Sequence, residues 1–143
     1  MGGESDRGIV ESSRAAEPMG AYPAARRVGN LLFVSGLGPR VRGATAIPGV
    51  LLDAKGAKVG RDIEAQCHSV FANLRMVLED AGSSWERIVD VTAFLTHLEE
   101  DFAVYNRVYA EAFGEVRPAR TTLGIVRLPS PIDVELKVIA TVD

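Results

Sequence analysis

The sequence has too few cysteines and histidines for a disulfide framework or a dedicated metal site. Cys67 is the single cysteine among 143 residues, so the chain cannot form an internal disulfide, and this fits a reducing compartment. His68 and His97 are the only histidines, and they belong to no cluster with the spacing of metal ligands. We therefore expect a fold that needs neither a disulfide nor a metal ion.

The sequence also lacks a long apolar run and an excess of positive charge. No stretch approaches the roughly 18 apolar residues of a membrane span, and residues 1–6 lack the charged and apolar segments of a signal peptide. The formal net charge of −3 gives no basic surface for nucleic acid. These absences favour a cytoplasmic protein with no membrane or nucleic-acid partner.

The chain does have the size and composition of one globular domain. Its 143 residues are 47% hydrophobic and 24% charged, which is enough apolar material for a core without staples. We expect a single domain over residues 1–143, in which the small and polar residues 1–6 form a disordered tail.

Hydrophobic periodicity predicts two sizeable helices. The first runs from Ile63 to Ala81, where apolar residues recur at i, i+3, i+4 and i+7. Asp62 is its expected N-cap and Gly82 its expected stop. The second helix is expected from about Asp101 to Phe113, and one helical turn from Ser84 to Arg87.

Short alternating segments predict five or six strands. Two helices cannot cover both faces of such a sheet, so we expect an α+β fold with both helices on one face and a partner chain over the other. The glycine-rich residues 36–60 are expected to form a long loop. The predicted strands are 8–12, 25–28, 31–35, 88–96, 120–126 and 132–142, the second and third joined by a Gly29-Asn30 turn.

Alternation along the last two strands predicts which side chains share a face. In 120–126, the row opposite the apolar residues carries Arg120 and Thr122. In 132–142, apolar residues alternate with a polar row of Asp133, Glu135 and Lys137. We expect the two polar rows to lie on one sheet surface, where a guanidinium can bind a carboxylate and an acid can accept a proton.

Five groups of residues, spread from about Met19 to Val142, carry a family resemblance. They are Gly20-Ala21-Tyr22, Leu32-Phe33-Val34-Ser35-Gly36, Asp101-Phe102 with Tyr105-Asn106, Pro118-Ala119-Arg120-Thr121-Thr122, and Val134-Glu135-Leu136-Lys137-Val138-Ile139-Ala140. The chain resembles the RidA/YjgF family of reactive intermediate deaminases. Within it, the chain is most similar to the 2-aminomuconate deaminases in Met19-Gly20-Ala21-Tyr22-Pro23, in the long insertion before the first helix, and in the Pro118–Thr122 motif.

The resemblance implies a fold, an assembly and a reaction. The fold would be the chorismate-mutase-like α+β fold of the bacillus type, assembled as a homotrimer around a central barrel. The active sites would lie in clefts between subunits. Catalytic members of the family hydrolyse enamines or imines of amino acids to 2-oxo acids and ammonia, without a metal or an organic cofactor. A small unsaturated amino acid is therefore the implied substrate.

The same resemblance implies residue roles. Arg120 would bind the substrate carboxylate, and Glu135 would position the attacking water. Tyr22 and Ser35 would line the cleft. Many family members that act on 2-aminoacrylate have cysteine where this chain has Thr122, so Thr122 is a candidate substrate-binding residue that disfavours that substrate.

A 2-aminomuconate substrate carries a second carboxylate and needs a second cationic group. Arg40 is the main candidate to bind this second carboxylate, and Arg42 and Arg127 are further candidates. Two other functions stay open at this point. One is a deaminase of the 2-aminoacrylate type, acting on 2-iminobutanoate or 2-iminopropanoate, and the other is a regulatory module that binds a small carboxylate without catalysis. Without a catalytic role, Arg120 would only form a surface or interface ion pair with Glu135 or a neighbour, and Glu135 would be a solvated strand carboxylate.

Overall fold

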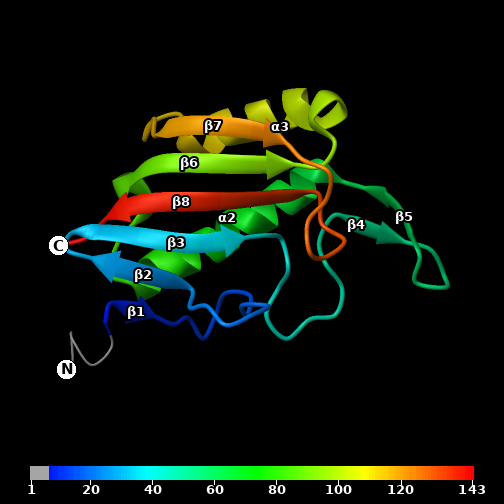
Figure 1. The fold of residues 1–143 in the computed structure, drawn as a ribbon. Helices are drawn as coiled ribbons and strands as arrows, with labels where there is room; N and C mark the ends of the chain where they lie inside the picture. The colour runs from blue at the N-terminus through cyan, green and yellow to red at the C-terminus, as the bar shows by residue number, and fades with distance from the viewer. Residues whose placement is uncertain (1–6) are drawn as a thin grey trace.

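In a computed structural model of the protein, which describes residues 7–143, two helices pack on one face of a six-stranded sheet (Figure 1). The strand order is β1-β2-β3-β8-β6-β7, and neighbours are antiparallel except for the parallel pair β6 and β7. This confirms the predicted α+β fold, while the predicted tail lies outside the described residues. The strands are β1 (Ile9–Val10), β2 (Ala25–Val28), β3 (Leu31–Leu37), β6 (Ile88–Leu95), β7 (Ala119–Gly124) and β8 (Val134–Thr141).

The helices α2 (Ile63–Asp80) and α3 (Leu98–Phe113) lie close to their predicted bounds. Asp62 caps α2 by accepting a hydrogen bond from the backbone N–H of Ala65 at 3.1 Å. Gly82 follows the helix with a φ of +80°, a conformation that glycine adopts without strain. α3 begins three residues before the predicted Asp101, because its acidic first turn suits a helix N-terminus and carries the start back to Leu98.

The predicted loop at 36–60 contains a hairpin that the sequence analysis missed. Its strands, β4 (Val50–Leu52) and β5 (Lys58–Arg61), stand apart from the six-stranded sheet (Figure 1). The Asp53 carboxylate closes the turn by accepting hydrogen bonds from two backbone N–H groups at 2.9 Å, and Gly56 has a φ of +84°. Strands this short show too little alternation to be recognised beside so many glycines.

The core lies between the sheet and the two helices. The predicted apolar row of β8 is confirmed, because Val134, Leu136, Val138 and Ala140 are all buried. Cys67 is fully buried on the inner side of α2, and burial raises the pKa of its thiol to about 12. It is therefore a packing residue rather than a nucleophile.

Strand register places Arg120 and Thr122 on the face of the sheet that the helices cover. Residues paired across neighbouring strands point to the same side. Arg120 pairs with Val91, which pairs with the buried Val138 of β8. Thr122 likewise pairs with the buried Ala93. Both polar side chains therefore continue the buried rows out to the edge strand β7.

Glu135 lies on the opposite face, which we call the open face because no helix covers it. Glu135 pairs with Phe94, and Phe94 pairs with Leu123 of β7. The prediction that Arg120 and Thr122 share a face with Glu135 is therefore wrong. Its premise was that Leu123 faces the helices, but on this edge strand Leu123 is 42% exposed on the open face.

Asp133 does not belong to the polar row of Glu135 as predicted, but precedes β8 and is buried. Its carboxylate accepts hydrogen bonds from Lys58 Nζ at 2.8 Å, Gln66 Nε2 at 2.8 Å and Thr96 Oγ1 at 2.9 Å. Burial alone would raise the pKa of Asp133, but these hydrogen bonds together lower it. The carboxylate thus ties the β4–β5 hairpin, α2 and the end of β6 to the start of β8.

We expect Asp133→Ala to lower the free energy of unfolding by about 2–3 kcal/mol, because Gln66 and Thr96 lose a buried acceptor. Chemical denaturation at pH 7 measures this loss. Glu115→Ala, at an exposed position, is the matched control and should change stability by less than about 0.5 kcal/mol.

The free energy of unfolding that Asp133→Ala loses should decrease as the pH falls. Because the pKa of Asp133 is lowered on folding, its stabilisation is complete above the unfolded value of about 3.9 and disappears as the pH falls through the folded value. The difference in the free energy of unfolding between wild type and Asp133→Ala should therefore become smaller at acid pH. A difference that stays constant from pH 7 to pH 3 would contradict the hydrogen-bonded carboxylate.

Candidate functional site

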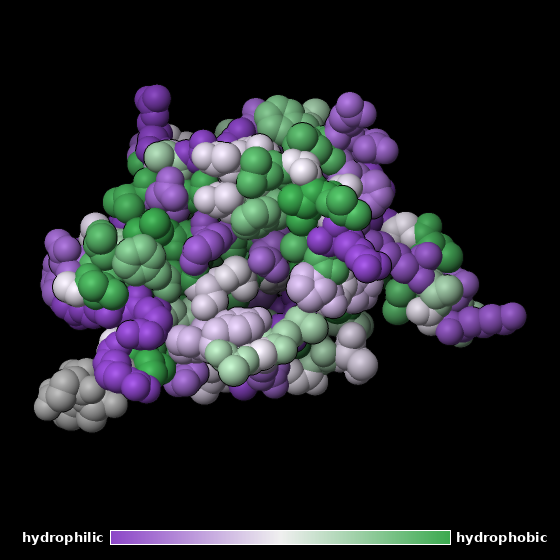
Figure 2. Space-filling model, in the orientation of Figure 1, coloured by the Kyte–Doolittle hydropathy of each residue, from purple (hydrophilic) through white to green (hydrophobic). Residues whose placement is uncertain are grey.

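The open face, which Figure 2 shows, contains a hollow that is lined in part by Glu135. This hollow, of about 320 Å³, takes its lining from β3, β8, the loop before β2 and the loop before β8. A smaller hollow beside it also contains Glu135, Tyr22 and Arg40. The structure therefore brings together four of the predicted site residues, Tyr22, Ser35, Arg40 and Glu135. The lining residues of the larger hollow are Tyr22, Ser35, Gly36, Pro129, Glu135 and Lys137.

The Glu135 carboxylate is half-buried and has no hydrogen bond or ion pair to any of residues 7–143. Burial raises its pKa, and no positive side chain offsets that effect. Gly36 lies directly beneath it, because a Cβ at that position would approach Glu135 Cδ to 2.9 Å. A glycine is thus required for the acid to rest on the backbone of β3, which is irregular between Val34 and Leu37.

Ser35 and Tyr22 form one wall of the hollow in different ways. The Ser35 hydroxyl donates a hydrogen bond to the Pro23 carbonyl at 2.8 Å, so it fixes the loop that carries Tyr22. The Tyr22 hydroxyl accepts from the Met19 N–H at 3.0 Å, and the residue is 45% exposed. Ser35 therefore acts on the loop, while the exposed ring of Tyr22 is the part that can touch a ligand.

The three arginines considered for a second carboxylate differ in availability. Arg40 lines the smaller hollow and donates to the carbonyl of Glu17. Arg42 donates to the carbonyl of Ala15 at 2.8 Å and to that of Ser12 at 2.7 Å, so its guanidinium already holds the chain together. Arg127 is exposed and does not line the hollow around Glu135.

Arg120 lies in an aromatic cradle on the helix side of β7. Its guanidinium carbon is 4.6 Å from the ring centre of Tyr109, 5.5 Å from that of Tyr105 and 6.0 Å from that of Phe102. Such contacts hold a guanidinium by the negative faces of the rings while leaving its N–H groups in the ring plane free. Within residues 7–143, no carboxylate pairs with Arg120.

Three buried hydroxyls accompany this cradle without a hydrogen-bond partner in the described part of the chain: those of Tyr105, Tyr109 and Thr122. In the sequence, Tyr105 and Tyr109 stand out only as part of the apolar stripe of the second helix. Tyr105 is indeed fully buried. The i, i+4 spacing of two tyrosines opposite an edge-strand arginine was the signal for the cradle.

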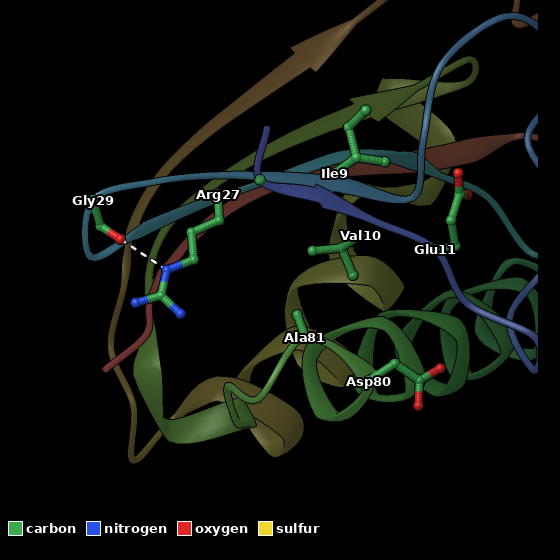
Figure 3. Close-up of a pocket in the computed structure, with 8 residues that line it drawn as sticks. Ile9, Val10, Glu11, Arg27, Gly29, Asp80 and Ala81 are labelled. Carbon is green, nitrogen blue, oxygen red and sulfur yellow. Dashed lines mark hydrogen bonds between the residues drawn. The ribbon is translucent and has the colours of Figure 1, made fainter. Parts of the chain in front are cut away.

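A larger groove at the other edge of the sheet is separate from the site. It measures about 570 Å³ and is built from β1, β2 and the end of α2 (Figure 3). Arg27 donates its Nε–H to the Gly29 carbonyl at 2.9 Å there, while Asp80 lies across the groove (Figure 3). None of the predicted site residues lines this groove, so its size alone does not make it a site.

Two classes of feature are absent over residues 7–143. No group of three or more His, Cys, Asp and Glu side chains is placed to hold a metal ion. No helix in this span has the length and apolar character needed to cross a membrane.

Comparison with known proteins assigns the chain to one family. A family model described as Endoribonuclease L-PSP matches residues 12–142. The chain belongs to this family, the RidA/YjgF family that its motifs resemble. It is 37% identical over 133 residues to a RutC family protein of Pyrococcus abyssi, an alignment that covers 92% of this chain and 94% of that protein.

Of two further RidA/YjgF relatives, one is named as a regulator and one was solved with a bound ligand. A Lactococcus lactis protein named as a proposed regulator, AldR, is 31% identical over 134 residues, covering 94% of this chain and 97% of that protein. Escherichia coli TdcF, solved with bound serine, superposes with a TM-score of 0.80 at 29% identity, covering 94% and 98% of the two chains. The predicted chorismate-mutase-like fold is thereby confirmed.

The electrostatics of Glu135 give a stability prediction. Because its pKa is raised on folding, its ionisation destabilises the native state as the pH rises above the unfolded value of about 4.3. We expect Glu135→Gln to raise the free energy of unfolding at pH 7 by on the order of 1 kcal/mol, and to have no such effect near pH 3.5. Urea titrations at both pH values measure the difference.

The matched control is Glu115→Gln, because Glu115 is exposed and its substitution removes the same charge. It should show little change at either pH. A Glu135→Gln variant that is less stable than wild type at pH 7, or equally stabilised at both pH values, would refute the conclusion that the Glu135 carboxylate is unpaired and desolvated.

Proposed function

We propose that this protein is a homotrimeric hydrolase that deaminates the enamine or imine form of an unsaturated amino acid, with 2-aminomuconate as its substrate. The single observation that carries the proposal is the half-buried Glu135, which has a raised pKa and no partner and lies in a hollow floored by Gly36. A carboxylate in that state is suited to accept and return a proton during catalysis.

The proposed site is completed by a second copy of the chain. Arg120 and Glu135 lie on opposite faces of one sheet, and neither has a charged partner within residues 7–143. A closed ring would bring Arg120 of one copy to the hollow of the next. The open face supports such a ring, because its apolar side chains are only partly covered: Val28, Leu31, Phe33, Phe94, Leu123 and Ile139.

The proposed reaction follows from these two groups. The guanidinium of Arg120 binds the substrate carboxylate through two parallel hydrogen bonds and draws electrons from the adjacent carbon. The enamine tautomerises to an imine, and water adds to the C=N carbon while Glu135 takes one of its protons and passes it to the nitrogen, which gives a carbinolamine. Glu135 then takes the carbinolamine hydroxyl proton and passes it to the nitrogen as the C–N bond breaks, so a carbonyl and ammonia result. Such proton transfer contributes roughly 10²–10⁴-fold.

Two other functions are alternatives to this deaminase. A non-catalytic carboxylate-binding module is favoured by the name of AldR and by the serine bound in TdcF. A 2-aminoacrylate-type deaminase differs in the smaller substrate, for which Thr122 is the unfavourable residue. Cleavage of RNA, which the family description names, is not supported by a chain with a net charge of −3.

Activity measurements separate these functions. With 2-aminomuconate generated in situ, we expect wild type to release ammonia and Glu135→Gln to lower kcat by roughly 10²-fold or more, because the proton acceptor is lost. Arg120→Ala should lower kcat/KM by a comparable factor, since the carboxylate loses a bidentate charged partner.

Glu115→Gln and Arg107→Ala are matched controls at exposed positions and should keep wild-type rates. Binding of a non-reactive 2-oxo acid should survive in Glu135→Gln. Wild-type binding without any ammonia release would favour the module, and faster turnover of 2-aminoacrylate than of 2-aminomuconate would favour the smaller substrate.

A further inference from the structure

Lys137 is the positively charged side chain among the six residues that line the larger hollow. It follows Glu135 by two residues on β8, so both side chains emerge on the open face. Lys137 is exposed, and its row neighbours on β6 and β7 are Thr92 and Thr121. A cation therefore lies beside the proposed proton acceptor.

The charge of Lys137 is not neutralised within residues 7–143. Its Nζ donates a hydrogen bond to the Val34 carbonyl at 3.3 Å, and no carboxylate of this part of the chain forms an ion pair with it. It also does not pair with Glu135, whose raised pKa has burial as its cause, with no lowering contribution from a cation. The ammonium thus reaches towards β3 and stays available to an anion.

The arginines that the sequence suggested for a second carboxylate are worse placed. Arg42 is held by two backbone carbonyls and lines neither hollow that contains Glu135. Of the two hollows that contain Glu135, Arg40 lines only the smaller, and it is bound to the Glu17 carbonyl. Lys137 alone among these cations lines the larger hollow and has a single weak bond to its own chain.

We propose that Lys137 binds the distal acid group of a dicarboxylate substrate and so determines specificity at the site of the proposed deaminase. This rests on the proposed function. The substrate's first carboxylate lies on Arg120 of a neighbouring copy, its reacting carbon lies at Glu135, and its second carboxylate lies on Lys137. The substrate class is an unsaturated amino acid with carboxylates at both ends, and a hollow of about 320 Å³ is within the usual range for small ligands.

Lys137→Met tests the proposal by removing the charge while keeping a similar length. The quantity to measure is the ratio of kcat/KM for a six-carbon enamine dicarboxylate to that for an enamine monocarboxylate. We expect the ratio to fall by about 10- to 100-fold, because a charged hydrogen bond to the distal acid is lost. Lys137→Arg should restore much of it. Lys55→Met, at the exposed tip of the β4–β5 hairpin, removes the same charge away from the hollow and should leave the ratio at its wild-type value.

A binding experiment separates this proposal from the proposed function. Calorimetry gives the Kd of a saturated six-carbon diacid and of its monoacid counterpart for wild type, Lys137→Met and Lys55→Met. If wild type releases no ammonia, the proposed function fails, and the diacid preference still decides the role of Lys137. A preference that Lys137→Met loses and Lys55→Met keeps supports the proposal. No preference in wild type, or an equal preference in Lys137→Met, overturns it.

Discussion

The alternation of side chains across one β-sheet is the constraint on which the candidate site depends. It assigns Arg120 to the face covered by helices and Glu135 to the open face, although the two strands are separated by β6 alone. Neither residue meets an opposite charge within residues 7–143. In the proposed function one chain therefore supplies two halves of different sites, a guanidinium in an aromatic cradle and an acid in a hollow, and a second copy is the simplest means to join them.

Ordinary structural elements leave both charged groups without a charged partner, and they hold Glu135 where burial disfavours its ionised form. Gly36 and the irregular segment of β3 let the Glu135 carboxylate rest where burial disfavours its charge. The rings of Tyr105 and Tyr109 hold Arg120 without neutralising it. Ion-paired groups would be less available to a substrate, so the proposed reaction uses their lack of a charged partner.

The framework around these groups explains how such instability is tolerated. The buried carboxylate of Asp133 joins the hairpin, α2 and β6 immediately before β8 begins, two residues from Glu135. The Ser35 hydroxyl fixes the loop of Tyr22 on the other side of the hollow. Satisfied polar groups therefore flank the unsatisfied ones, and the free energy lost at the site is offset by the network around it.

The sequence predicted what depends on local periodicity and missed what depends on neighbours. α2 and the apolar row of β8 follow from regular patterns, and the gathering of Tyr22, Ser35 and Glu135 was expected from the family motifs. The face of Arg120 was wrong, because on an edge strand the apolar Leu123 can face a partner rather than the core. The proposed role of Lys137 did not follow from the sequence, because a lysine on a polar row ordinarily only meets water.

The most direct measurement of the central claim mixes two inactive variants, Arg120→Ala and Glu135→Gln, by coexpression in equal amounts. If each site takes Arg120 from one copy and Glu135 from the next, random mixing leaves both groups intact in about one quarter of the sites, and about one quarter of wild-type activity returns. If both groups of a site come from the same chain, no mixed assembly contains an intact site. Activity that stays at the level of the separate variants would therefore contradict the account.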